Sequence, residues 1–183
     1  EVVVRATDDI ESLSRKVRLA TILGTIQSTY TKFPYLRKVW QRNTEEERLL
    51  GVSLTGIMDN PLMTTANKGL EKTLETLRKL AVDTNTLWAN RLGIPASAAI
   101  TCVKPSGTVS QLVDSASGIH ARHSKYYIRT VRGDNKDPLT QFMKDQGVPS
   151  EPDVMKPDAT TVFSFPVQSP TNAVVTSDLS AIE

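Results

Sequence analysis

The chain has 183 residues, enough for one domain with a hydrophobic core, and its 39% apolar and 23% charged residues are typical of a globular protein. The formal net charge of +2 argues against nucleic acid or an anionic membrane as a partner. No apolar run approaches the ~20 residues needed to span a bilayer. The single cysteine excludes an intramolecular disulfide, so we expect a cytoplasmic setting. The chain begins without Met, and we therefore expect it to be a piece of a larger protein.

Two helices are predicted in the first part of the chain. Apolar residues recur at helical spacing over residues 8–31, and either Thr7 or Asp8 is expected to cap this helix. Thr44 and Glu47 have the spacing of a capping box, which predicts that a short helix begins there.

A strand, a helix and a second strand are predicted next. Residues 49–57 alternate apolar with small or polar side chains and are predicted to form a strand. A long amphipathic helix is expected over residues 65–90, followed by a short buried strand at residues 98–103.

The last part of the chain alternates in the same way. Strands are predicted at residues 126–131 and 160–165, the second closed by Pro166. Between them Asp137 and Pro138 have the pattern of an N-cap followed by the first helical residue. The alternation of strands and helices predicts an α/β fold with parallel strands.

The most informative segment joins the strand at 98–103 to a short helix expected to end near Val113. It consists of Lys104, Pro105, Ser106, Gly107, Thr108 and Val109. Such a junction exposes backbone N–H groups that bind anions, glycine allows a ligand to approach the backbone, and lysine supplies charge. Two interpretations fit these residues: a phosphate site, or an ordinary capped helix after a strand.

Both histidines, His120 and His123, lie in the next segment around Arg122. Three interpretations fit them: two ligands of a metal site, a solvated loop, or a loop that lines a ligand cleft with His120, Arg122 and Tyr126 as polar contacts.

Two further features have simpler interpretations. Lys125, Arg129 and Arg132 form either a phosphate-facing patch or a solvated strand face. Cys102 is expected to be a buried, inert thiol, because no base or second cysteine accompanies it.

Three blocks of sequence resemble the monomeric-type, adenosylcobalamin-dependent ribonucleoside-triphosphate reductases. They are residues 50–59, residues 103–109 with 117–120, and residues 126–129 with 137–139 and 161–166. The resemblance implies that residues 1–183 form the C-terminal portion of a ten-stranded α/β barrel, without a separate domain boundary.

The resemblance also implies an activity. In this family a thiyl radical on a cysteine, generated with the cobalt cofactor adenosylcobalamin, starts the replacement of the ribose 2′-hydroxyl by hydrogen. Two more cysteines become a disulfide that thioredoxin reduces, and the deoxyribonucleotides serve DNA replication. The family's phosphate-binding turn corresponds to Pro105, Ser106, Gly107, Thr108 and Val109. His120, His123 and Tyr126 are candidates for a cofactor-facing cleft.

The chain departs from the family where the radical chemistry occurs. The Asn-x-Cys-x-Glu and Cys-Asn-Leu motifs that carry the catalytic and redox cysteines are absent, and the allosteric specificity site is expected upstream. We therefore expect no catalytic residue and no metal ligand in this fragment, and a monomeric parent enzyme. The alternatives are a stand-alone nucleotide- or phosphate-binding module without catalysis, and a structural domain whose turn only caps a helix.

Overall fold

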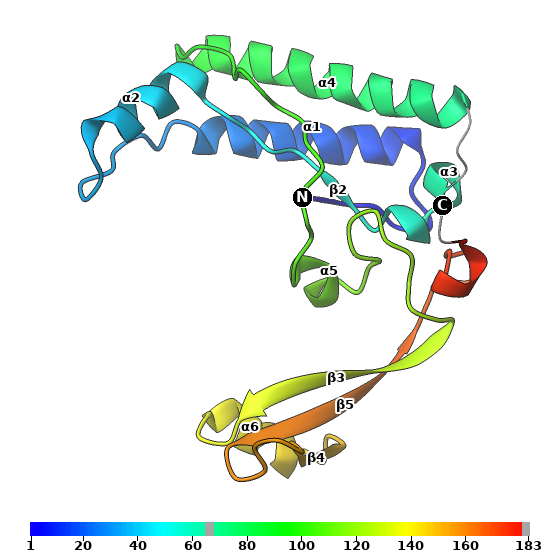
Figure 1. The fold of residues 1–183 in the computed structure, drawn as a ribbon. Coiled ribbons are helices and arrows are strands. Elements are labelled where there is room, and N and C mark those ends of the chain that lie inside the picture. The colour runs from blue at the N-terminus through cyan, green and yellow to red at the C-terminus, as the bar shows by residue number, and fades with distance from the viewer. Residues whose placement is uncertain (65–67, 181–183) are drawn as a thin grey trace. The chain divides into compact units, whose positions relative to one another are not determined.

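The computed structural model describes residues 1–64 and 68–180. Contacts divide the chain into two compact units (Figure 1). The first unit is Glu1–Arg122 with Asn172–Glu183, and the second unit is His123–Thr171. The start of the helix predicted at residues 65–90 lies outside the described residues. No helix in the described part of the chain is both long and apolar enough to cross a membrane.

The first unit is built from short parallel strands and longer helices. Its elements are β1 (Val2–Val3), α1 (Ile10–Gln27), α2 (Lys38–Glu47), β2 (Leu54–Thr55), η1 (Ile57–Asp59), α3 (Pro61–Thr64), α4 (Lys68–Leu92), α5 (Val109–Leu112) and η2 (Thr176–Asp178). β1 pairs with β2 in parallel, and a parallel bridge joins Val52 to Thr101. Three parallel segments therefore follow one another in chain order. The second and third lie where strands were predicted, although residues 101–103 are exposed rather than buried, and β1 was not predicted.

Two helices cover one face of these parallel segments. Figure 1 shows α1 and α4 side by side, both beginning at the same end of the unit. The core between helices and strands includes Leu13, Val17, Val52, Leu77 and Ile100.

A polar contact also joins the two helices. The buried Asn85 amide donates to Thr25 Oγ1 at 3.0 Å and to Ser97 Oγ at 2.9 Å, so α4 is tied to both α1 and the loop that leads into the third parallel segment.

Two predicted helix starts are wrong. Asp9, rather than Thr7 or Asp8, caps α1 by accepting from Ser12 N at 2.8 Å in a capping box. Thr44 and Glu47 lie in the last turn of α2, not its first, because α2 already begins at Lys38. The capping-box spacing of Thr44 and Glu47 therefore does not mark a helix N-terminus.

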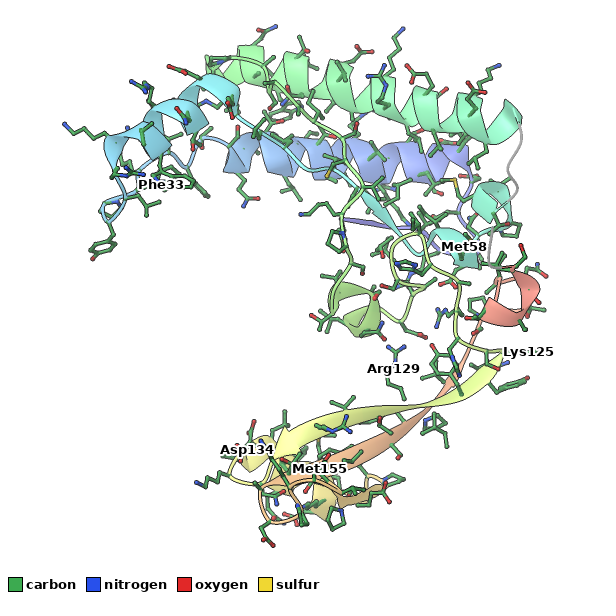
Figure 2. All side chains as sticks on the ribbon, in the orientation of Figure 1. Phe33, Met58, Lys125, Arg129, Asp134 and Met155 are labelled. Atoms are coloured by element: carbon green, nitrogen blue, oxygen red, sulfur yellow. The ribbon has the colours of Figure 1, made fainter. Side chains whose placement is uncertain are left out.

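The second unit is an antiparallel sheet with one helix. Its elements are β3 (Tyr126–Asp134), α6 (Pro138–Asp145), β4 (Ser150–Pro152) and β5 (Thr160–Gln168), and the strand order is β3-β5-β4. In Figure 2 Lys125 and Arg129 lie toward the beginning of β3 and Asp134 at its end. The predicted N-cap is confirmed: Asp137 Oδ1 accepts from Leu139 N at 2.9 Å, with Pro138 next.

The parallel arrangement predicted for this part of the chain is wrong. β3 and β5 pair antiparallel over all nine of their residues. β3 and β4 both pair antiparallel with β5, so β3 and β4 run in the same direction and α6 joins them. β4 was not predicted, and β5 follows it as the second strand of a hairpin, so β5 runs opposite to β3. Pro166 lies inside β5 rather than after it, opposite Ile128.

Candidate functional site

The predicted phosphate-binding turn lies at the carboxyl end of the third parallel segment. This segment is held against the strand before it, because Cys102 N donates to Val52 O at 3.1 Å. The chain then leaves the sheet through Lys104 and reaches α5 at Val109. Ligands of parallel α/β sheets bind at such carboxyl ends.

The turn is open to solvent at its centre. Gly107 has a φ of +54°, and a Cβ placed on it would meet no atom within 4 Å. Pro105 and Thr108 are also exposed. An anion can therefore approach the backbone at Gly107.

Three successive amides in this turn point to a possible ligand. Among residues 1–64 and 68–180, the N–H groups of Ser106, Gly107 and Thr108 donate to no protein acceptor. Val109 N differs, because it donates to Ser106 O at 3.1 Å. Successive amides in left- and right-handed helical conformations form a concave anion-binding nest, and Gly107 and Thr108 have these conformations.

Ser106 is buried in the turn and is hydrogen bonded to α5. Its side chain is 5% exposed, and its Oγ accepts from Ser110 N at 3.0 Å. Ser110 is itself buried, and its carbonyl accepts from Ser115 N at 2.9 Å. The turn is therefore tied to the loop that follows α5.

Lys104 extends along the sheet beside Gly51. The Lys104 Cδ and Nζ atoms lie 3.4 and 3.9 Å from the position that a Gly51 Cβ would occupy. The lysine also lines a hollow of about 520 Å³ that Glu1 and Leu50 share. Its ammonium therefore lies beside Gly51, on a hollow that none of residues 105–109 lines.

A buried ion pair lies under the loop after α5, and the sequence analysis missed it. Arg122 Nε and Nη2 donate to Asp59 Oδ1 and Oδ2, each at 2.9 Å, and both side chains are 3% exposed. Arg122 Nη1 also donates to Asp114 Oδ1 at 2.9 Å. A sequence signal existed, since Asp59 follows a strand of the same sheet, but nothing in the sequence linked it to an arginine 63 positions later.

This ion pair corrects one prediction. Arg122 was one of three polar contacts proposed for a ligand cleft, but its guanidinium is buried against two carboxylates.

The three candidates for a cofactor-facing cleft do not lie in one unit. His120 is exposed in the first unit, while His123 and Tyr126 belong to the second. His123 contacts Tyr127 edge-to-face, with ring centroids 5.9 Å apart, and Lys125 Nζ lies 5.9 Å from the Tyr126 ring centroid. No group of three metal-ligating side chains occurs within the residues that the structure describes.

Cys102 is exposed, so the prediction of a buried thiol is wrong. The third parallel segment pairs with Val52, and beside it Cys102 lines an apolar cavity of about 390 Å³ with Val103 and Leu77.

The basic residues of β3 are partly engaged within the second unit. Arg129 lies 5.6 Å from the Tyr127 ring centroid, and Arg132 Nε donates to Asp153 Oδ2 at 2.8 Å. The Arg132 hydrogen bond is the main reason that the pKa of Asp153 lies below its ordinary value.

Comparisons with known proteins place these features in a family context. No family model matches the chain. Adenosylcobalamin-dependent ribonucleoside-triphosphate reductase from Lactobacillus gasseri is 30% identical over 172 residues, which cover 79% of this chain and 23% of that protein. The protein of the same name from Euglena gracilis is 30% identical over 151 residues, covering 79% of this chain and 20% of that protein.

The fold has a solved counterpart. A crystal structure of B12-dependent (class II) ribonucleotide reductase matches with a TM-score of 0.72 and 24% identity, covering 87% of this chain and 26% of that chain. The chain therefore has the fold of part of a class II ribonucleotide reductase, as predicted. Within that class it is homologous to a segment of the adenosylcobalamin-dependent ribonucleoside-triphosphate reductases, and the predicted resemblance is confirmed. The chain spans about a fifth to a quarter of the length of these relatives.

Proposed function

We propose that residues 1–183 are a C-terminal portion of the catalytic barrel of an adenosylcobalamin-dependent ribonucleoside-triphosphate reductase, and that the turn from Lys104 to Val109 binds the substrate's phosphates. The observation that carries the proposal is the open turn with three successive free amides, at the carboxyl end of a parallel strand. Such a nest fits a phosphate group, and the choice of a triphosphate rests on the similarity to the ribonucleoside-triphosphate reductases.

Each residue of the turn has a distinct part in this proposal. The amides of Ser106, Gly107 and Thr108 donate to phosphate oxygens, and the exposed Thr108 hydroxyl adds a further donor. Lys104 supplies a positive charge, and Pro105 stiffens the turn. Holding the triphosphate in one orientation fixes where the ribose lies. Orientation of this kind lowers the activation free energy of a reaction by about 7 kcal/mol.

The hydrogen-abstraction chemistry belongs, in this proposal, to other segments of the reductase. Adenosylcobalamin would start the radical chemistry there, and thioredoxin would restore the redox cysteines. The described residues do not by themselves form a cofactor cleft. Hollows of about 390 and 520 Å³ lie in the first unit and one of about 510 Å³ in the second, and of His120, His123 and Tyr126 only Tyr126 lines one of them. We therefore assign no step of the reaction through the cofactor to these residues.

The phosphate site is tested by calorimetric titration of the chain with tripolyphosphate and with CTP. Gly107→Ala forces a Cβ onto a backbone with φ +54°; the space is open, so the strain of about 1–2 kcal/mol is relieved by rotating the amides of the turn away from the ligand. We expect affinity for both ligands to fall at least about tenfold.

Gly93→Ala is the matched control. Gly93 also has a positive φ, +66°, with nothing within 4 Å of a Cβ, but it lies after α4. It should carry the same strain and leave affinity unchanged. Equal affinities for wild type and both variants would refute the phosphate site.

A stand-alone binding module would give the same affinities in this titration. A different observation is therefore needed to distinguish the module from a reductase fragment. We expect the coding sequence that precedes Glu1 to encode Asn-x-Cys-x-Glu and Cys-Asn-Leu. A start codon directly before Glu1 would favour the module.

A further inference from the structure

We propose that the buried Asp59–Arg122 ion pair positions the phosphate-binding turn, by fixing the loop against which Ser110 and Ser106 are hydrogen bonded. This inference rests on the proposed phosphate site for its consequence in binding. The structural part of it, control of the turn's shape, stands on contacts within the first unit alone.

The ion pair is hydrogen bonded to the loop residues on both sides of Ser115. On one side, Arg122 donates to Asp114 twice, from Nη1 to Oδ1 at 2.9 Å and from Nη2 to the carbonyl at 3.1 Å. On the other side, the Ala116 amide donates to Asp59 Oδ2 at 2.8 Å. Residues 114 and 116 are therefore held by the two members of one pair, and Ser115 between them is held in place.

Hydrogen bonds connect Ser115 to the phosphate-binding turn. Its amide donates to the Ser110 carbonyl at 2.9 Å, and the Ser110 amide donates to Ser106 Oγ at 3.0 Å. Three of these groups are buried: Ser106, Ser110 and Ser115 are each no more than 5% exposed. A buried hydrogen-bonded chain with no water-exposed link has one low-energy arrangement, so a displacement of the loop must displace Ser106.

Positioning of the turn requires the forked guanidinium of Arg122. One planar guanidinium reaches Asp59 through two nitrogens and Asp114 through a third, which a lysine ammonium cannot do. The Arg122 backbone is held separately, because its amide donates to Val174 O at 3.0 Å and its carbonyl accepts from Thr176 N at 2.8 Å. Replacing the Arg122 side chain therefore removes its hydrogen bonds to Asp114 and Asp59 while the end of the loop stays anchored. Arg5 Nη1 still donates to the Asp114 carbonyl at 3.0 Å, so the Asp114 side chain is the group that loses its partner.

The test compares Arg122→Lys with Asn85→Ala in the 183-residue chain. Arg122→Lys keeps a positive charge beside Asp59, so the charge is not left unpaired. Asn85→Ala removes buried hydrogen bonds in the same unit, to Thr25 and Ser97, with no contact to the turn. Two readouts are measured on each: hydrogen exchange of the Ser110 and Ser115 amides, and calorimetric affinity for tripolyphosphate.

We expect Arg122→Lys to speed exchange at Ser110 and Ser115 and to weaken tripolyphosphate binding, each by at least about tenfold. Asn85→Ala should lower thermal stability but leave both readouts unchanged. A folded Arg122→Lys protein with wild-type exchange at these amides overturns the positioning role.

A second variant covers the case in which Arg122→Lys does not fold. Asp114→Gly keeps a residue that tolerates the φ of +45° at this position and removes the side-chain oxygen that accepts from Arg122 Nη1. Faster exchange at Ser115 is the expected result, and unchanged exchange contradicts the proposal. If the wild-type chain binds no tripolyphosphate, the phosphate site fails, while the exchange data still decide whether the ion pair orders the turn.

Discussion

Two hydroxyl residues on the same strand segment, Ser53 and Thr55, are both buried but differ in their partners. Thr55 Oγ1 accepts from Gly118 N at 2.9 Å and so joins the sheet to the loop after α5. Ser53 Oγ is buried and has no hydrogen-bond partner among residues 1–64 and 68–180. A buried polar atom without a partner costs free energy, whereas a partnered one stabilises the fold.

Substitution of these two residues should therefore change stability in opposite directions. Ser53→Ala removes an unsatisfied hydroxyl, and we expect the free energy of unfolding to stay the same or rise by about 1 kcal/mol. Thr55→Val keeps the shape but leaves the Gly118 amide without an acceptor, which should cost about 1–3 kcal/mol. Urea denaturation of the two variants checks this; a larger loss for Ser53→Ala than for Thr55→Val would contradict it.

Local patterns predicted helix starts with mixed success. The Asp137–Pro138 start was correct, but the equally local patterns at Thr7 or Asp8 and at Thr44 gave wrong helix starts. The Asp59–Arg122 pair depends on two segments 63 positions apart, so no local pattern could indicate it. The exposed state of Cys102 depends on which strands flank it, which is again not a local property.

At the scale of elements, the ionised Asp8 side chain stabilises the start of α1 in addition to the helix N-cap. Burial alone would raise the pKa of Asp8, but hydrogen bonds from the Lys16 ammonium, the Arg5 amide and Ser12 outweigh it and leave the pKa below the ordinary value of 3.8. Lys16 Nζ also donates to the carbonyl of Val3 at 3.0 Å, which links α1 to β1.

This arrangement predicts an acid sensitivity with a definite sign. A carboxylate whose pKa is lowered by folding stabilises the protein above its unfolded value of 3.8, and that stabilisation is lost as the pH falls through the folded pKa. Because the pair is partly exposed, we expect Asp8→Asn to cost no more than about 1 kcal/mol near neutral pH. Below the folded pKa the difference from wild type should shrink, in thermal melts measured from pH 6 downward in steps of about one unit. An equal difference at every pH would argue against this role.

The element predictions failed where a short strand was missed. A strand, helix and strand in succession indicated a parallel unit, but β4 lies between α6 and β5 and reverses the chain, which makes β3 and β5 antiparallel. The parallel direction of the segments predicted at residues 49–57 and 98–103 was correct, because the 25-residue helix α4 between them is long enough to return the chain across the sheet.

At the scale of the whole molecule, both units leave large apolar side chains open to solvent. Examples are Leu19, Leu23 and Val103 in the first unit and Ile128 and Val154 in the second. The parallel segments of the first unit are short, and the regular pairing that they form is limited to β1, β2 and one bridge. Both features suit the proposed part of a larger barrel, in which further strands and helices would cover these surfaces. The predicted absence of a separate domain boundary over residues 1–183 remains a prediction.

The measurement that tests the phosphate site most directly is an NMR titration of the ¹⁵N-labelled chain with tripolyphosphate. We predict that the amide resonances of Ser106, Gly107 and Thr108 shift most and saturate together, because these three N–H groups lack a protein acceptor and would gain one from the ligand. Titration to saturation with these three resonances unmoved, or with the largest shifts on β3, would contradict the account.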